Sequence, residues 1–212
     1  DEPVITDLEE LRNYFMQKGE FFKVFKNEII YKERKNASFV YYVEKGLVKT
    51  HRMDEYGKEL ITSISKKNDF FGFYYFRNLS QYPETATALQ ATNLYRLSSL
   101  NFQELLQQNH RLTLDLAQML SDKLSALKTN LLEMAYASVL KKTTNTILQF
   151  AEIMKDNAQE GIRISRTDLA SVAGISTESF IRSLSSLKKE GLIDIEGRNI
   201  KILDLQKLHS IK

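Results

Sequence analysis

The 212-residue sequence contains no cysteine and no tryptophan, and only two prolines. Without cysteine the chain cannot form disulfides, thiolate metal sites or iron–sulfur clusters, and it has no cysteine nucleophile. No apolar run approaches the roughly 18 residues needed to span a bilayer, and the acidic start of the chain lacks the basic region of a signal peptide. We therefore expect a cytoplasmic protein with no membrane partner.

Histidine is also scarce, and its placement is uninformative for metal binding. His51, His110 and His209 are scattered along the chain, without the spacing of a metal site or a neighbouring nucleophile. We expect no metal, no cofactor and no catalytic residues. The formal net charge of +3 permits an anionic partner, but a mild excess of positive charge does not locate one.

The composition, with 42% hydrophobic and 27% charged residues, is that of a globular chain long enough for two domains. Between residues 21 and 98, short β-branched and aromatic runs alternate with charged or glycine-containing turns, which predicts antiparallel β structure. Gly57 can supply the positive φ of a hairpin turn between residues 48–53 and 59–64. From Ser99 to about Ala137 there is no proline or glycine, and recurring Leu and Met predict a long helix.

One stripe of this helix repeats at alternating four- and three-residue steps, as in the a/d seam of a coiled coil. The stripe, called the seam below, consists of Thr113, Ala117, Leu120, Leu124, Leu127, Leu131 and Met134. Packing of the seam on the chain's own β domain is the alternative interpretation. Five consecutive large apolar positions favour pairing with a second copy, which predicts a two-fold homodimer.

The rest of the chain predicts three more helices, over residues 140–155, 166–173 and 177–189, with a short strand at 162–164 before the second. Ser165 and Ser176 are suited to cap the second and third helices, and Gly174 ends the second. The connecting turn is short enough to hold two crossed helices, which is helix-turn-helix spacing. The apolar residues that would form its core are Leu169, Ile175, Phe180, Leu184 and Leu187.

The opposite face of the third helix carries Thr177, Glu178, Ile181 and Arg182 near its N-terminus. A helix in the major groove presents its N-terminal residues to base edges. Arginine can bind guanine O6 and N7, glutamate can accept from the cytosine amino group, and isoleucine can contact a thymine methyl. Glu178 and Arg182 could instead form an exposed intrahelical pair. Because phosphate repulsion disfavours an acid on a DNA-facing surface, we favour base reading.

A hairpin wing is predicted over residues 191–202, where two short alternating strands flank a glycine-containing turn with Arg198 at its tip. Several flanking side chains are suited to phosphate contacts, which position a module on DNA without reading sequence. These candidates are Ser165, Arg166, Ser176, Ser179 and Arg198.

The sequence resembles the CRP/FNR family of bacterial transcription regulators over nearly its whole length. The most specific match runs from Ile164–Ala170 through Gly174 to Ser176–Arg182, and Val43–Val48 and Asn68–Gly72 are similar to turns of the family's β-roll. The resemblance implies an α+β fold with an N-terminal β-roll (a double-stranded β-helix, or cupin-like jelly roll), a long dimerisation helix and a C-terminal winged helix-turn-helix. The implied domains cover residues 1–110, 111–137 and 138–212. The implied partners are double-stranded DNA, RNA polymerase and a second copy of the chain.

Two departures from the family pattern concern specificity. Thr177 stands where cAMP-responsive members carry an arginine, so we expect a different half-site. Relatives that bind cyclic nucleotides have Gly-Glu, Arg-Ser and Thr-Ser at positions that read here Gly72-Phe73, Tyr82-Pro83 and Leu127-Lys128. The adjacent Glu84 would repel a phosphate, and the cation and donors that a cyclic phosphate needs are missing. We expect that any effector is a small molecule other than cAMP.

The aromatic run from Phe70 to Phe76 admits two interpretations, an apolar ligand pocket or ordinary core packing, and core packing is favoured. A candidate effector pocket would comprise Phe73, Tyr74, Glu84, Thr85, Leu127 and Lys128. Two other functions stay open beside the regulator. A cupin-like enzyme would need clustered metal ligands in the strands, and a protein-interaction adaptor would bind its partner without steep salt dependence. A regulator that needs no effector is also consistent with the sequence.

Overall fold

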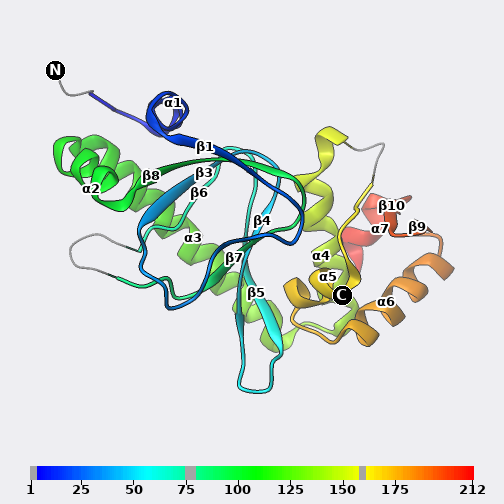
Figure 1. The fold of residues 1–212 in the computed structure, drawn as a ribbon. Coiled ribbons are helices and arrows are strands. Elements are labelled where there is room, and N and C mark those ends of the chain that lie inside the picture. Colours follow the sequence, from blue (N-terminus) through cyan, green and yellow to red (C-terminus); the bar gives the residue numbers. More distant parts are fainter. Residues whose placement is uncertain (1–3, 75–79, 158–160) are drawn as a thin grey trace. The chain divides into compact units, whose positions relative to one another are not determined.

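The computed structural model describes residues 4–74, 80–157 and 161–212. The chain divides into two compact units, one formed by Asp1–Arg52 with Thr62–Ala126 and the other by Met53–Ile61 with Leu127–Lys212. Figure 1 labels the elements along the chain. None of the helices in these described ranges is long and apolar enough to cross a membrane.

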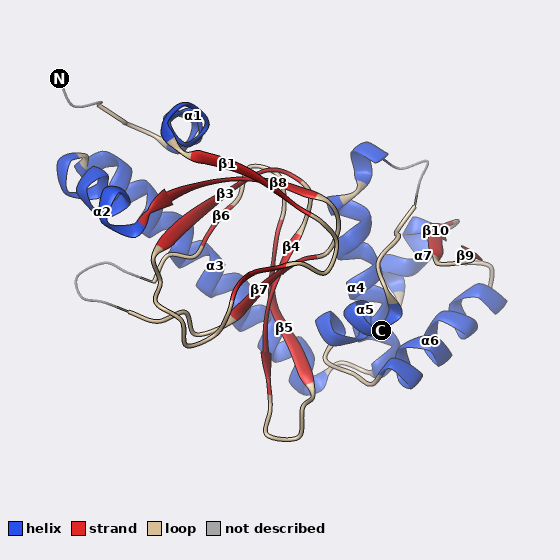
Figure 2. Cartoon of the chain, viewed as in Figure 1, coloured by secondary structure: helices blue, strands red, loops and turns tan. Residues whose placement is uncertain are grey.

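The first half of the chain forms two four-stranded sheets, with strand orders β1-β8-β3-β6 and β2-β7-β4-β5. In the first, β8 pairs antiparallel with β1 and β3, and in the second β7 pairs antiparallel with β2 and β4. The strands, red in Figure 2, are β1 Glu20–Val24, β2 Ile29–Tyr31, β3 Phe39–Lys45, β4 Val48–Met53, β5 Glu59–Ser65, β6 Phe70–Phe71, β7 Thr85–Ala88 and β8 Thr92–Ser98. The predicted antiparallel β-roll is confirmed.

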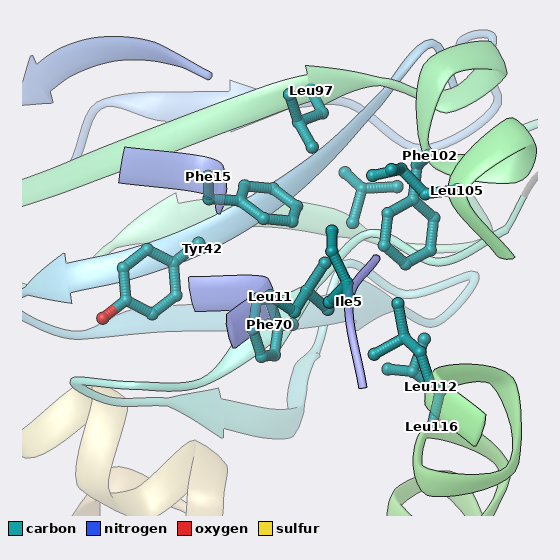
Figure 3. Packing of buried hydrophobic residues seen from close by; sticks show 11 residues of the cluster. Ile5, Leu11, Phe15, Tyr42, Phe70, Leu97, Phe102, Leu105, Leu112 and Leu116 are labelled. Carbon is teal, nitrogen blue, oxygen red and sulfur yellow. The ribbon is translucent and has the colours of Figure 1, made fainter. Parts of the chain in front are cut away.

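Successive residues of β3 point to opposite faces of their sheet, and each face has its own core. Tyr41 and Val43 join a cluster, called the roll interior below, that contains residues of both sheets. Val40 and Tyr42 join a second cluster with the helices α1 (Leu8–Lys18), α2 (Ser99–Gln108) and α3 (His110–Tyr136). Figure 3 shows this second cluster, to which the helices contribute Phe15, Phe102, Leu112 and Leu116.

Two turns of the roll use left-handed backbone. Gly57 has φ 78° in the turn between β4 and β5, where Asp54 N donates to Lys58 O at 2.9 Å, so the predicted hairpin is confirmed. Asn68 has φ 75° at the position where the family resemblance leads us to expect glycine. Asparagine tolerates this region better than most residues, which explains the substitution.

The single helix predicted from Ser99 to about Ala137 is wrong in one respect, because it is broken at Asn109 into α2 and α3. The buried Asn109 side chain accepts a hydrogen bond from Ile5 N and donates one to Leu105 O, both at 2.9 Å. These bonds fix Asn109 in a non-helical conformation with φ −126° and ψ 84°. The break follows from a contact with the distant start of the chain, which helical periodicity does not reveal.

The second half contains α4 Val139–Ile153, a short 3₁₀ helix Lys155–Asn157, α5 Arg166–Ala173, α6 Thr177–Lys189, β9 Ile193–Glu196, β10 Asn199–Ile202 and α7 Leu205–Ser210. The bounds predicted for α5 and α6 are confirmed, and α4 packs against both helices. The strand predicted at residues 162–164 is wrong, because only Ile162 forms an isolated bridge, to Ile200. The predicted wing is present as the antiparallel pair β9 and β10.

Candidate nucleic-acid interface

The turn between α5 and α6 is fixed by local hydrogen bonds. Ser165 Oγ accepts from Asp168 N and Ser176 Oγ accepts from Ser179 N, each at 3.1 Å, so both predicted N-caps are confirmed. Gly174 ends α5 at φ 71°, a left-handed conformation that glycine adopts without strain. These bonds define the start of α6 and therefore the direction in which its first turn points.

The inward face of α6 packs against α4 and α5. Phe180, Leu184 and Leu187 are at most 2% exposed, as is Leu169 of α5. Ile175, which was predicted to belong to this core, is only half-buried. Because the buried positions repeat at the spacing of one helix face, Glu178, Ile181 and Arg182 on the opposite side face away from the core, whereas Ser183 is buried with it.

The outward face of α6 presents Glu178, Ile181 and Arg182 to solvent, and Thr177 is half-buried beside them. Ile181 is 45% exposed, although it is a large aliphatic residue on a helix with a well-filled core. Within the described part of the chain, no ion pair joins Glu178 to Arg182. The intrahelical pair considered from the sequence is not formed, and both charged groups are available to a partner.

The wing is a two-residue hairpin. Glu196 pairs with Asn199, which leaves Gly197 and Arg198 in the loop, and Gly197 has φ 64°. The base of the wing is tied to the chain before α5, because Ile200 N donates to Ile162 O at 3.0 Å and Ile162 N donates to Ile200 O at 2.8 Å. Arg198 is exposed at the tip.

The predicted phosphate-contacting residues lie at the two helix N-termini and on the wing. Ser176 is exposed, whereas Ser165 and Ser179 are half-buried. The serine hydroxyls also act within the domain, since Ser176 Oγ bonds Ser179 Oγ at 2.9 Å. The first backbone N–H groups of a helix point outward and attract anions, so the same two helix starts are suited to phosphate oxygens.

Arg166 has a second role that the sequence did not suggest. Its Nη1 donates to the backbone oxygen of Arg198 at 3.0 Å, which links the first residue of α5 to the tip of the wing. Burial lowers the pKa of the half-buried Arg166 guanidinium from its usual value. The contact joins residues 32 positions apart, so no local sequence pattern could have revealed it.

Comparison with known proteins agrees with this geometry. Residues 14–109 match the family described as the cyclic nucleotide-binding domain, and residues 131–211 match the Crp-like helix-turn-helix domain. The chain belongs to the CRP/FNR family. It is a transcription regulator with a DNA-binding helix-turn-helix domain, and not an enzyme.

Named relatives span most of the chain. The "cAMP-activated global transcriptional regulator CRP" of Salmonella typhimurium is 26% identical over 181 residues, which cover 84% of this chain and 86% of the relative. The "Anaerobic regulatory protein" of Pasteurella multocida is 22% identical and covers 94% of this chain and 73% of its own. FixK2 of Bradyrhizobium japonicum has the same fold, with a TM-score of 0.78 at 21% identity over 91% of this chain and 96% of that one.

The seam of this CRP/FNR chain is exposed on α3. Leu120, Leu124, Leu127 and Leu131 are 40%, 53%, 43% and 58% exposed, Ala117 is exposed and Met134 is half-buried. Other residues of α3, Leu112 and Leu116 with Met119 beside them, pack against the β-roll. Within the unit that holds the β-roll, the seam residues Ala117, Leu120 and Leu124 are therefore not buried against it, which disagrees with the alternative in which the seam packs on the β domain.

The candidate effector residues of the β-roll do not line one space. Phe73 packs against the cluster beneath the helices, whereas its neighbour Tyr74 packs against the roll interior. Glu84 Oε1 accepts from Thr62 Oγ1 at 2.8 Å, and Thr85 Oγ1 accepts from Glu33 N at 3.1 Å. Leu127 and Lys128 of the same set are exposed and belong to the second unit. The described part of the aromatic run thus serves core packing, and Tyr75 and Phe76 lie outside the described residues.

Tyrosines fill the roll interior. The rings of Tyr31 and Tyr82 stack at 3.7 Å, and Tyr82 Oη donates to Phe39 O at 2.7 Å and accepts from Phe39 N at 3.1 Å. Burial raises the pKa of Tyr31 and Tyr82 above the usual range, and burial together with the Glu84 charge raises that of Tyr74 to about 12. Neutral phenols and a carboxylate therefore surround the space between the sheets.

Arg96, a cation that acts on Tyr41 and Tyr82, already has partners. Arg96 Nε donates to Glu20 Oε2 at 2.8 Å, and its guanidinium lies 3.9 Å from the centre of the Phe39 ring. A cyclic nucleotide carries an anionic phosphodiester and needs a free cation and hydrogen-bond donors. The described residues of this roll do not fit that ligand, and residues 75–79, which include Arg77, lie outside the described range.

Proposed function

We propose that the protein regulates transcription as a homodimer that reads a palindromic DNA operator with α6 of each protomer. The observation that carries this proposal is the outward face of α6, where Glu178, Ile181 and Arg182 are exposed and the two charged groups have no partner among the residues that the structure describes. Unpaired charges next to an exposed aliphatic side chain, at the N-terminus of the second helix of a helix-turn-helix, match the requirements of major-groove reading.

Each of these side chains is assigned a role at the bases. Arg182 donates two hydrogen bonds to guanine O6 and N7, Glu178 accepts from the amino group of a cytosine, and Ile181 contacts a thymine methyl. Thr177 lies beside them and completes the reading surface. Because an uncompensated carboxylate is repelled by phosphates, Glu178 is expected to select against sites that lack a donor at its position.

Phosphate contacts orient the domain without reading sequence. Ser165, Ser176, Ser179 and the wing residue Arg198 are proposed for this role, supported by the free N–H groups at the start of α5 and α6. Arg166 was grouped with them from the sequence, and its bond to the wing is treated separately below.

The exposed seam is proposed to pair with the seam of a second copy. A 27-residue helix with four exposed leucines at heptad spacing meets the requirement for a two-stranded coiled coil. Residues 1–110 would then form the β-roll domain, 111–137 the dimer helix and 138–212 the reading domain. The dimer presents two recognition helices to half-sites about 34 Å apart in cytoplasmic DNA, and contacts RNA polymerase from there.

The proposed regulator does not bind a cyclic nucleotide. The relative from Salmonella is named as cAMP-activated, but the roll interior of this chain is occupied by stacked tyrosines, and among the described residues the Glu84 carboxylate acts on Tyr74 while Arg96 is paired with Glu20. An effector-independent regulator explains the filled interior most simply, and a non-nucleotide effector is the alternative.

The test is selection of DNA from a random duplex pool by the purified protein at moderate salt, first without ligand and then with cAMP. Palindromes with half-site centres one helical turn apart, enriched equally in both arms, would support the proposal. Retention without any enriched sequence would refute operator reading. Enrichment only with cAMP would refute the proposal that the protein does not bind a cyclic nucleotide. No retention in either arm would favour a protein-interaction adaptor, which binds its partner without the salt dependence of phosphate contacts.

A further inference from the structure

We infer that Arg166 is a positioning residue that holds the tip of the wing, and that it acts on DNA through Arg198 rather than by touching a phosphate itself. The inference rests on the proposed function, because the role of Arg198 at phosphates is part of that proposal. The observation behind it is the hydrogen bond from Arg166 Nη1 to Arg198 O.

A two-residue hairpin loop needs such a support. The loop residues Gly197 and Arg198 lie beyond the last paired residues, Glu196 and Asn199, so the strands do not hold the Arg198 backbone directly. The bridge between Ile162 and Ile200 holds the second strand of the wing two residues after Arg198. The guanidinium of Arg166 supplies a second attachment, at the tip itself.

The surroundings of Arg166 also disfavour a direct phosphate contact. Its guanidinium is half-buried and desolvated, whereas Arg198 is exposed. A hydrogen bond from a charged donor to a backbone carbonyl is stronger than one between neutral groups, so releasing it to reach a phosphate carries a cost. Arg198 reaches solvent without breaking any contact of the described residues that involves its side chain.

The division of roles can be tested by a double-mutant cycle on operator binding with Arg166→Met and Arg198→Gln, measured over a range of salt concentrations. Each phosphate contact contributes about 0.9 to the slope of log affinity against log salt. Arg198→Gln should lower the slope by about that amount per protomer and weaken binding on the order of tenfold. Arg166→Met should weaken binding by a similar factor, because the tip is no longer held.

The decisive variant is the double substitution. If Arg166 acts through Arg198, adding Arg166→Met to Arg198→Gln should change neither affinity nor slope further, since the two residues form one unit. If Arg166 binds its own phosphate, the effects should add and the slope should fall by a further 0.9 or so per protomer, which would overturn the inference. Arg166→Gln, which removes the charge but keeps a donor, repeats the cycle should Arg166→Met prove unstable.

A measurement on the free protein separates this inference from the proposed function. Hydrogen–deuterium exchange in the β9–β10 loop should speed up in Arg166→Met without DNA, while exchange in α6 stays as in the wild type. Unchanged exchange in the loop would refute the support of the wing, even if DNA binding is lost. Failure of the unmodified protein to bind any operator would refute the proposed function and leave the exchange result to decide the support of the wing.

Discussion

The roll interior and the outward face of α6 place polar groups in opposite surroundings. In the roll, the hydroxyl of Tyr82 is buried and bonded to both backbone groups of Phe39. On α6, the charged ends of Glu178 and Arg182 are exposed and have no partner in the described chain. Buried polar groups with partners stabilise a fold, whereas exposed unpaired groups are free to recognise a ligand. We therefore expect the exposed groups on α6, in the second half of the chain, to recognise a ligand.

The two regions also differ in how closely their residues match the family pattern. The helix-turn-helix segment keeps residues suited to base reading, and they lie where a reading surface requires them. The β-roll has the expected strands and turns, but Phe73 and Tyr82 stand where the family resemblance places phosphate-binding residues of relatives that bind cyclic nucleotides, and Glu84 lies close to Tyr82 in sequence. A shared fold does not by itself imply a shared ligand.

A charge introduced into the seam should have the largest effect on DNA affinity. Leu131→Glu places a charge in the proposed dimer interface and should convert the protein to monomers, lowering affinity for a palindrome by about 1,000-fold or more because one half-site is lost. Sedimentation equilibrium and operator titration measure both effects. Leu132→Glu is the matched control, since Leu132 is 62% exposed, Leu131 is 58% exposed, and Leu132 lies outside the seam. Equal behaviour of the two variants would contradict pairing through the seam.

Opening the roll interior should lower stability without changing DNA recognition. Tyr82→Ala removes the stack on Tyr31 and both hydrogen bonds to Phe39, and should cost roughly 3 to 5 kcal/mol in the free energy of unfolding. Urea denaturation measures the loss, and Tyr56→Ala, at a residue that is 81% exposed, should be neutral. A folded Tyr82→Ala protein that no longer prefers the operator would contradict the separation of the two regions.

Removing Arg182, which is proposed to read a base, should change DNA recognition without lowering stability. Arg182→Ala should weaken operator binding by about 1 to 3 kcal/mol per half-site and relax the preference at one G·C pair, with little change in stability, because the residue is exposed. Competition titrations against operators substituted at each position measure the preference. Lys189→Ala, at the other end of α6, serves as the charge control. A uniform loss on all sequences would identify Arg182 as a phosphate contact instead.

Alkaline titration should distinguish the buried tyrosines by their pKa values. The folded pKa of Tyr31, Tyr74 and Tyr82 lies above the usual 10.0 because burial favours the neutral phenol. Their contribution to stability is therefore complete below pH 10 and is lost as the pH rises through the folded values, of which that of Tyr74 is about 12. Phenolate absorbance and circular dichroism should change together for these residues. Ionisation of all tyrosines near pH 10 with the fold intact would contradict a closed interior.

The smallest expected change in the free energy of unfolding comes from removing a helix cap, and two caps can be compared. Ser98 accepts from Asn101 N at the start of α2, and Ser176 accepts from Ser179 N at the start of α6, each at 3.1 Å. Replacing either serine by alanine should cost about 1 kcal/mol in the free energy of unfolding. Only Ser176→Ala should also weaken DNA binding, because its helix start is proposed to contact phosphate. Equal DNA affinity of the two variants would remove Ser176 from the interface.

Elements whose signals are local could be predicted from the amino-acid sequence. The bounds of α5 and α6 follow from serine caps, from Gly174 and from a buried stripe at helical spacing, all within a few residues of each other. The seam follows in the same way from heptad spacing, and the exposed face of α6 from its position opposite that stripe. Such features depend on neighbours along the chain, so pattern and capping chemistry are sufficient to predict them.

Features that depend on distant partners became visible in the folded chain and could not be predicted from local patterns. The helix break at Asn109 follows from a bond to Ile5, the attachment of the wing from a bond between Arg166 and Arg198, and the opposite directions of Phe73 and Tyr74 from two separate cores. Each partner is brought near by the fold rather than by the sequence, and the side chains involved have other conformations of similar energy when it is absent. Local periodicity was therefore sufficient to predict the exposed face of α6, whereas long-range packing sets the contact between Arg166 and the wing and the side chains that fill the roll.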